Sequence, residues 1–250
     1  MIQITNDEFR LLAKYIKENS GIHLKEEKRA LLVGRLSNML SEMGINSFMD
    51  YYHYLQADSG GKELSRLIDK ITTNHTYFMR ESEHFTYLLE HVLPYWEKHA
   101  DRKDLRVWCA ASSTGEEPYT LAMILQDYFS MKDKGWDKKL LATDLSLNVL
   151  EQAKNGTYIA EKVTTLPKIW VLNYFDRRQD GHYQIKEHIR NQVIYRRFNL
   201  MDNIFPFKRK FHVVFCRNVM IYFDNETKER LVEKIYKHME YGGYLFIGFS

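Results

Sequence analysis

The sequence predicts an α/β protein in which a mostly parallel sheet carries a small antiparallel insertion and follows an all-α N-terminal part. Three observations lead to this class. From residue 105 onward, short apolar runs alternate with amphipathic helical segments, as in a parallel sheet built from strand–helix units. Residues 174–186 hold two β-prone runs around Asp180-Gly181, a strong hairpin signal. Residues 1–71 show only helical periodicity.

The composition is that of an ordinary globular protein. Of the 250 residues, 44% are hydrophobic and 28% are charged, and the net charge of +3 is too small to indicate nucleic-acid binding. No apolar run approaches the roughly 18–20 residues of a membrane-spanning helix, and the N-terminus lacks the features of a signal peptide. We therefore expect a cytoplasmic protein without membrane insertion. We also expect a monomer. Cys109 and Cys216 are expected to be reduced core thiols, and the histidines show no metal-ligand spacing, so no metal is expected.

Four helices are predicted in the first 71 residues. They cover residues 7–18, 25–43, 48–56 and 61–71, with Gly44 ending the second and a Ser-Gly-Gly break preceding the fourth. This part has no titratable cluster of its own. We therefore expect this part to dock on a partner or to cover a site, and not to supply catalytic groups.

Residues 72–96 are predicted to link the helical part to the α/β domain, which then spans residues 97–250. The stretch Thr72–Glu81 (TTNHTYFMRE) is polar and aromatic, and the helix at Ser82–Trp96 is expected to end near Pro94. The polar side chains of the stretch either form hydrogen bonds within a loop or face a ligand at the domain junction.

The stretch Leu105–Phe129 predicts a strand, a tight turn and a helix, the first half of a nucleotide-binding unit. The turn at Ser112–Gly115 has a single glycine, and the helix after it opens with Glu116 and Glu117. Two carboxylates at a helix N-terminus would repel a pyrophosphate. A ligand with an adenosine and a cationic arm, such as S-adenosylmethionine, suits this turn better. The alternative is that both glutamates only complement the helix dipole.

Residues 139–143 predict a second strand that ends on Asp144, followed by a helix over 146–154. An acid about 20–30 residues past the glycine turn can accept hydrogen bonds from both ribose hydroxyls of an adenosine. The alternative is that Asp144 caps the next helix, a role that Ser146 could share.

The remaining segments complete the sheet and bring polar groups to one of its edges. The antiparallel insertion is placed at about residues 156–192. Strands are expected at 193–198, 211–216 and 244–249, the last after a Gly242-Gly243 turn, with a helix at 225–240 capped by Asp224 or Asn225. Ligands bind beyond the carboxyl ends of parallel strands. We therefore expect four segments to converge there: Ser112–Glu117, Asp144, Asn199-Leu200 and Arg217–Tyr222.

Five stretches together closely resemble the chemotaxis receptor methyltransferases of bacteria, the CheR family. They are TTNHTYFMRE, VWCAASSTGEEPYTLAM, LLATDLS, FNLMDN and FHVVFCRNVMIYFD. The resemblance covers nearly the whole chain. It implies a Rossmann-like class I S-adenosylmethionine-dependent methyltransferase sheet, preceded by a receptor-docking helical domain. It also implies an enzyme that esterifies glutamate side chains on chemoreceptor cytoplasmic helices and releases S-adenosylhomocysteine.

The resemblance also implies roles for individual residues. Arg80 and Tyr222 match the positions at the methyl-transfer point and are the expected catalytic residues. The family's cofactor contacts fall on Asn74, Thr76, Arg80, Glu117, Asp144, Asn199, Leu200, Arg217 and Asn218. Met79 stands where the family often has a second aromatic residue, and beyond Ser250 we would expect an acidic residue and a closing antiparallel strand.

Two docking routes for the chemoreceptor follow from the resemblance. A receptor C-terminal peptide could pair with the inserted hairpin as an added strand, or the N-terminal helices could dock on the receptor helices. We favour the second route, with Lys28 and Arg35 on the polar face of the helix at 25–43.

The expected chemistry requires few catalytic groups. A glutamate carboxylate is already a nucleophile, so the chain has to supply positioning and desolvation and no general base. Nucleic-acid methyltransferases would need an Asn/Asp-Pro-Pro-aromatic motif or a Pro-Cys nucleophile, and the sequence has neither. A non-catalytic module that senses S-adenosylmethionine stays open as the alternative.

Overall fold

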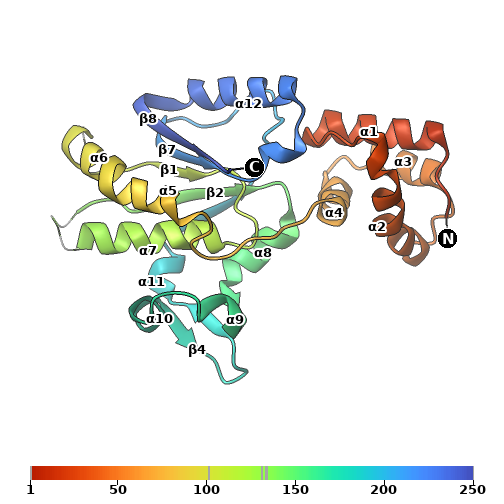
Figure 1. Ribbon diagram of the computed structural model, residues 1–250. Coiled ribbons are helices and arrows are strands. Elements are labelled where there is room, and N and C mark those ends of the chain that lie inside the picture. The colour runs from red at the N-terminus through yellow and green to blue at the C-terminus, as the bar shows by residue number, and fades with distance from the viewer. Residues whose placement is uncertain (1, 101, 131, 133–134, 250) are drawn as a thin grey trace.

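The structure, a computed structural model, describes residues 2–100, 102–130, 132 and 135–249 (Figure 1). Its N-terminal part contains the predicted helices: α1 (Asn6–Ser20), α2 (Arg29–Glu42), α3 (Phe48–Gln56) and α4 (Lys62–Ile71). Thr5 begins α1 with a capping box, in which its hydroxyl accepts from the backbone N–H of Glu8 and the Glu8 carboxylate accepts from the N–H of Thr5. Before α2, the short 3-10 turn η1 (Glu26–Lys28) takes up residues that the sequence predicts to be part of the helix itself.

The connecting helix continues past the point where the sequence predicts its end. It consists of α5 (Ser82–Tyr87), the π-helical turn η2 (Leu88–Val92) and α6 (Leu93–His99). The predicted end near Pro94 is wrong because Pro94 lies in the first turn of α6, where its missing N–H leaves no hydrogen bond unmade. The wider turn of η2, in which the N–H of Leu93 bonds to the carbonyl of Leu88, makes this new start possible.

The main sheet is parallel throughout the described residues, as predicted. Its strand order is β6-β2-β1-β7-β8, and each neighbouring pair is parallel. The strands are β1 (Val107–Cys109), β2 (Leu140–Asp144), β6 (Val193–Arg197), β7 (Phe211–Cys216) and β8 (Met239–Ile247). The helices between them are α7 (Glu116–Ser130), α8 (Leu147–Asn155) and α12 (Asn225–Lys237).

The last strand begins earlier than predicted. Gly242 and Gly243 lie inside β8, where the pairing shifts register between Phe211–Met239 and Val213–Tyr244. Gly242 has φ +76°, and a Cβ there would lie 2.8 Å from the hydroxyl of Tyr95. The two glycines therefore form an irregularity, such as a β-bulge, within β8. The predicted turn before the strand is wrong.

The predicted antiparallel insertion lies between α8 and β6. Its sheet has the order β3-β5-β4, and Asp180 and Gly181 form the turn of the β4–β5 hairpin. Its elements are β3 (Thr157–Tyr158), α9 (Ala160–Val163), α10 (Lys168–Tyr174), β4 (Phe175–Arg177), β5 (Tyr183–Ile185) and α11 (Glu187–Arg190). In Figure 1 the insertion projects from the sheet on the side of α7 and α8.

Alternate residues of the central strands enter two separate hydrophobic cores. Val107 and Cys109 of β1 join the core that α5, α6 and α7 cover together with the insertion. Trp108 joins a second core, which is continuous with the apolar faces of α1–α4 and with Leu231 and Ile235 of α12. This alternation follows from the two-residue period of a strand. The helical domain and one face of the sheet therefore share a single core.

None of the helices among the described residues is both long enough and apolar enough to cross a membrane.

Candidate functional site

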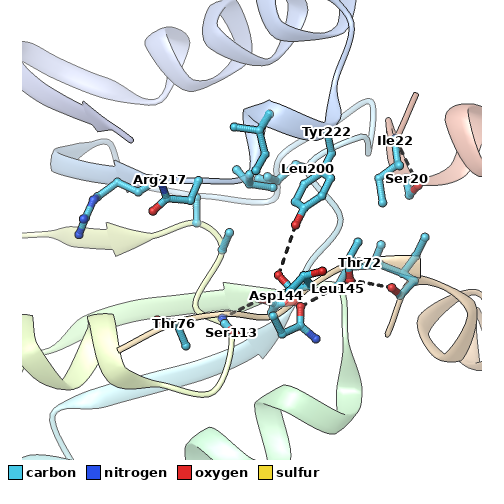
Figure 2. A pocket seen from close by; sticks show the side chains of 18 of the residues that line it. Ser20, Ile22, Thr72, Thr76, Ser113, Asp144, Leu145, Leu200, Arg217 and Tyr222 are labelled. Carbon is cyan, nitrogen blue, oxygen red and sulfur yellow. Dashed lines mark hydrogen bonds between the residues drawn. The ribbon is translucent and has the colours of Figure 1, made fainter. Parts of the chain in front are cut away.

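A cavity of about 320 Å³ opens at the carboxyl ends of the central strands, between the sheet, the linker and the helical domain (Figure 2). All four segments that we expected to converge reach it, as Ser113, Asp144, Asn199 and Arg217 show. Nine of the ten residues predicted for the site line this cavity: Asn74, Thr76, Arg80, Asp144, Asn199, Leu200, Arg217, Asn218 and Tyr222.

The turn after β1 is held against Asp144. Ser113 and Gly115 have positive φ values of 45° and 99°, and the N–H of Ser113 donates to the Asp144 carboxylate at 2.9 Å. A Cβ on Gly115 would lie 2.8 Å from the hydroxyl of Tyr158, so the turn requires glycine for both its conformation and its close packing. The backbone of this turn is thus held by an acidic side chain.

Asp144 has the environment expected for an acceptor of hydroxyl groups. Each of its carboxylate oxygens accepts one backbone N–H, from Ser113 at 2.9 Å and from Ser146 at 3.0 Å. Burial raises the pKa of Asp144, and these two hydrogen bonds oppose the shift. Its remaining lone pairs can accept two further donors. The capping alternative for Asp144 is wrong, because the Ser146 hydroxyl caps α8 by accepting from the N–H of Val149.

Arg217 is buried between two carboxylates. Its side chain is 1% exposed, and its guanidinium lies 2.8 Å from the Glu117 carboxylate and 3.2 Å from that of Glu81. It also donates to the backbone carbonyl of Arg80. Burial would raise the pKa of Glu81, but hydrogen bonds from Asn218 and Arg217 bring it below its usual value. Arg217 thereby ties the strand end of β7 to the linker.

Glu117 is the one predicted residue that does not reach the cavity wall. Its carboxylate lies behind the wall, where it accepts from Arg217 and from the Cys109 thiol at 2.9 Å. Burial raises the pKa of Glu117 and outweighs the opposing effect of Arg217. Glu81 is the residue that the sequence reasoning missed. The sequence does contain a sign of its role, because Glu81 is the last residue of the TTNHTYFMRE stretch.

Arg80 lies on a strained part of the linker. The residues on either side, Met79 and Glu81, have φ values of 58° and 55°, which non-glycine residues rarely adopt. Each such residue costs about 1–3 kcal/mol, and such strain is concentrated at functional sites. The Arg80 guanidinium donates to the carbonyl of His75 at 2.7 Å, and among the described residues its nearest carboxylate is that of Glu81 at 3.9 Å. It is therefore positioned without being neutralised by a close ion pair.

Tyr222 approaches the linker from the other side of the cavity (Figure 2). It ends the 3-10 turn η3 (Met220–Tyr222) after β7, and its hydroxyl donates to the carbonyl of Thr73 at 3.3 Å. Its backbone carbonyl accepts from the N–H of His23 at 2.8 Å. Tyr222 is thus fixed between the linker and the helical domain.

The helical domain closes one side of the cavity with Ser20 and Ile22. The Asn199 amide donates to the carbonyl of Asn19 at 2.7 Å, and Lys17 pairs with Asp224 at 2.6 Å. These contacts join α1 to the segments that follow β6 and β7.

The cavity fits a ligand with an adenosine and no phosphate. A partly buried carboxylate with free lone pairs lies at the end of β2, and the glycine turn next to it is held by that same carboxylate. Phe198 and Leu200 provide apolar walls. No group of His, Cys, Asp and Glu among the described residues is arranged to hold a metal ion. This fold and this cavity define an S-adenosylmethionine-dependent methyltransferase.

Comparisons with known proteins give the family. Residues 7–72 match the all-alpha domain of CheR methyltransferases, and residues 74–250 match their S-adenosylmethionine-binding domain. The chain is 42% identical to a chemotaxis protein methyltransferase of Borreliella burgdorferi over 252 residues, which covers 100% of this chain and 89% of that protein. It is 34% identical to the chemotaxis protein methyltransferase of Salmonella typhimurium and 33% identical to that of Escherichia coli, covering 100% of this chain and 85% of each relative. The chain belongs to the CheR methyltransferase family.

Proposed function

We propose that this methyltransferase esterifies glutamate side chains on the cytoplasmic helices of chemoreceptors. The observation that carries the proposal is the placement of Arg80 and Tyr222, which line the same cavity as Asp144. One cavity thus holds an acceptor suited to a nucleoside and a cation suited to an incoming carboxylate. The relatives are themselves named chemotaxis protein methyltransferases.

Bound S-adenosylmethionine supplies a methyl group activated by its sulfonium. Asp144 accepts the ribose hydroxyls, while Asn74, Thr76, Asn199 and Leu200 complete the cofactor pocket. Arg217 and Asn218 act through Glu81 and Glu117, because their polar groups are already engaged with these carboxylates. Glu117 accordingly supports Arg217 and does not contact the cofactor directly.

Arg80 orients the substrate carboxylate and offsets its desolvation. Its distance of 3.9 Å from Glu81 leaves the guanidinium free to form such a contact. Tyr222 borders the same space and excludes water. No proton has to be removed from a carboxylate, so positioning supplies the catalysis.

We further propose that receptor helices dock on the helical domain. Lys28 is exposed at the start of α2 and can meet an acidic helix surface. Arg35 has a different role from the one expected, since its guanidinium donates to the carbonyls of Lys70 and Thr72 and to the hydroxyl of Thr73. It holds the start of the linker, and reversing its charge would disturb the site as well as the surface.

The inserted hairpin is the second candidate for receptor binding. Among the described residues, β4 is an edge strand that pairs with β5 alone, so its other edge can accept an added strand from a receptor C-terminal peptide. Arg177 and Arg178 flank this edge and favour an acidic peptide.

The test measures transfer of labelled methyl groups to a receptor fragment, with and without its C-terminal tail. Base-labile release of methanol identifies a carboxyl methyl ester. Lys28→Glu should slow methylation of the tailless fragment, and Lys154→Glu, which changes an exposed lysine on α8, should not. Equal rates for both variants would refute docking on the helical domain. Loss of wild-type activity when the receptor fragment lacks its tail would instead place binding at the hairpin. Cofactor binding without any methyl transfer would refute the proposed reaction.

A further inference from the structure

The inserted subdomain contacts the site at two places that the proposed reaction does not use. One contact is with the turn after β1, and the other is with the linker that carries Arg80. Between them lies Tyr158 of β3, which belongs to the insertion and takes part in both.

The first contact fixes the turn that borders the cofactor cavity. The Tyr158 hydroxyl donates to the carbonyl of Thr114 at 2.8 Å and packs against Gly115. Next to it, Lys162 of α9 pairs with Glu116, whose side chain is completely buried and also accepts from the Thr114 hydroxyl. Leaving a buried carboxylate without its cation is costly. The insertion therefore restrains the turn through both a hydrogen bond and a charge.

The second contact fixes the linker two residues before Arg80. Phe78 is 3% exposed, and its ring packs edge-to-face against Tyr158 at 4.9 Å and against Phe175 of β4 at 5.6 Å. Each such aromatic pair contributes beyond simple burial. The strained backbone at Met79 and Glu81 needs rigid neighbours to persist, and Phe78 provides one.

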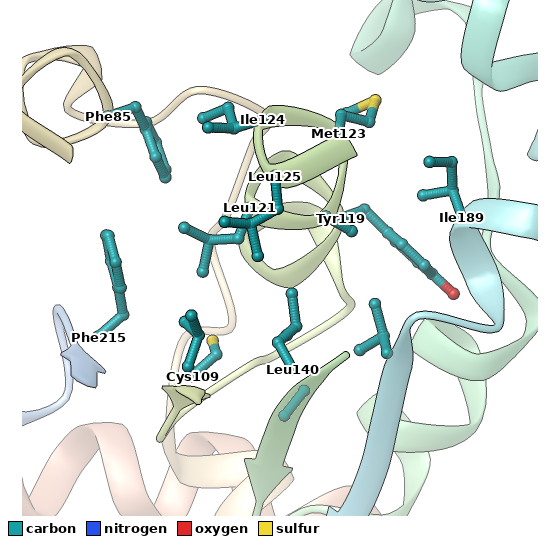
Figure 3. Packing of buried hydrophobic residues seen from close by; sticks show 14 of the residues in the cluster. Phe85, Cys109, Tyr119, Leu121, Met123, Ile124, Leu125, Leu140, Ile189 and Phe215 are labelled. Carbon is teal, nitrogen blue, oxygen red and sulfur yellow. The ribbon is translucent and has the colours of Figure 1, made fainter. Parts of the chain in front are cut away.

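The insertion can hold the turn and the linker in place because it is itself anchored to helix α7. Figure 3 shows Ile189 of α11 facing Tyr119 and Met123 of α7 within the first core. The Tyr174 hydroxyl donates to Asp127 in the last turn of α7. This anchor lies apart from both the turn and the linker.

We infer that the inserted subdomain positions the methyl-transfer site, with Tyr158 and Lys162 holding the cofactor turn and Phe78 holding Arg80. A strand added to β4 next to Phe175 then acts on turnover as well as on substrate affinity. The inference rests on the proposed use of the cavity for S-adenosylmethionine.

A matched pair of variants tests the turn. Tyr158→Phe and Tyr174→Phe each remove one hydroxyl hydrogen bond between the insertion and the main domain, but only Tyr158 contacts the turn. Calorimetry with S-adenosylhomocysteine should show binding about 2- to 10-fold weaker for Tyr158→Phe, the range of one hydrogen bond, and binding within twofold of wild type for Tyr174→Phe. Should Tyr158→Phe fail to fold, Lys162→Gln removes the other contact and takes its place.

Phe78→Leu tests the linker through the split between turnover and binding. We expect methyl transfer at saturating cofactor to fall about 10-fold or more while the dissociation constant of S-adenosylhomocysteine changes less than twofold. Equal weakening in both tyrosine variants, or wild-type binding by Tyr158→Phe and Lys162→Gln, would overturn the role of the turn contact. Wild-type turnover in Phe78→Leu would overturn that of the linker contact. Failure of the wild-type protein to bind S-adenosylhomocysteine would instead refute the cofactor assignment.

Discussion

Replacing Arg217 by methionine should be among the most destabilising single changes in the site. The side chain is 1% exposed and is bonded to Glu117 at 2.8 Å and to Glu81 at 3.2 Å. Arg217→Met keeps much of the volume but leaves Glu117 without a cation and takes from Glu81 its closest one, and breaking a buried ion pair costs about 3–5 kcal/mol. At about 2–4 °C per kcal/mol for a chain of this size, Tm should fall by about 6–20 °C.

The pH dependence gives this prediction a second measurable part. Burial already raises the pKa of Glu117, and without Arg217 that pKa rises further. Below this raised pKa the folded state of the variant binds more protons than the unfolded state, so its stability increases as the pH falls through the raised pKa toward the pKa of an exposed glutamate. The difference in stability from wild type should therefore be largest at neutral pH and above, and smaller in mild acid.

Thermal and urea unfolding of both proteins over that pH range measure the effect, with Arg106→Met as the control. Arg106 also pairs with two carboxylates, those of Asp104 and Glu240, but at a more exposed position. Arg106→Met should lower the free energy of unfolding by less than Arg217→Met does. The difference in stability between Arg106→Met and wild type should not shrink in mild acid in the same way. A loss below about 1 kcal/mol in Arg217→Met, or one that does not change with pH, would refute our account of the Arg217 site.

Three further predictions concern the cavity. Asp144→Ala should weaken binding of S-adenosylhomocysteine in calorimetry by about 1.5–3 kcal/mol, the range for hydrogen bonds to a charged group, and wild-type affinity would exclude the ribose contact. Arg80→Ala and Tyr222→Phe should lower kcat far more than they raise the cofactor KM in steady-state assays, and the reverse pattern would assign both residues to the cofactor pocket. Gly115→Ala should lower Tm in calorimetric scans, because its Cβ would lie 2.8 Å from the Tyr158 hydroxyl at a φ of +99°, and an unchanged Tm would show that the turn can adjust.

Much of the fold could be predicted because the decisive signals are local. Buried parallel strands appear as short apolar runs, and the Asp180-Gly181 hairpin is marked by its own turn residues. The errors arose where tertiary contacts outweigh a local rule. Pro94 follows a π-helical turn instead of ending the helix, and Gly242 meets Tyr95 from a different part of the chain.

The candidate site was predictable to the extent that it follows from topology. Strand ends of a parallel sheet meet at one edge, so Asp144, Asn199 and Arg217 had to approach one another. The partners within the site were not predictable. Glu117 was expected to face the cofactor, but its orientation depends on Arg217, which lies 100 residues further along the chain. Such a pairing has no signature in the sequence near either residue.

The shared core of the helical domain and the sheet limits how new receptor preferences can be engineered or can evolve. Exchanging residues 1–71 between two members of the family would also exchange one wall of the cofactor cavity and part of the core that contains Trp108. A working chimera must therefore keep the partners of Asn199 and Asp224 on α1. Outward-facing positions such as Lys28 can vary without this constraint, and under the docking proposed above divergence in receptor choice should concentrate there.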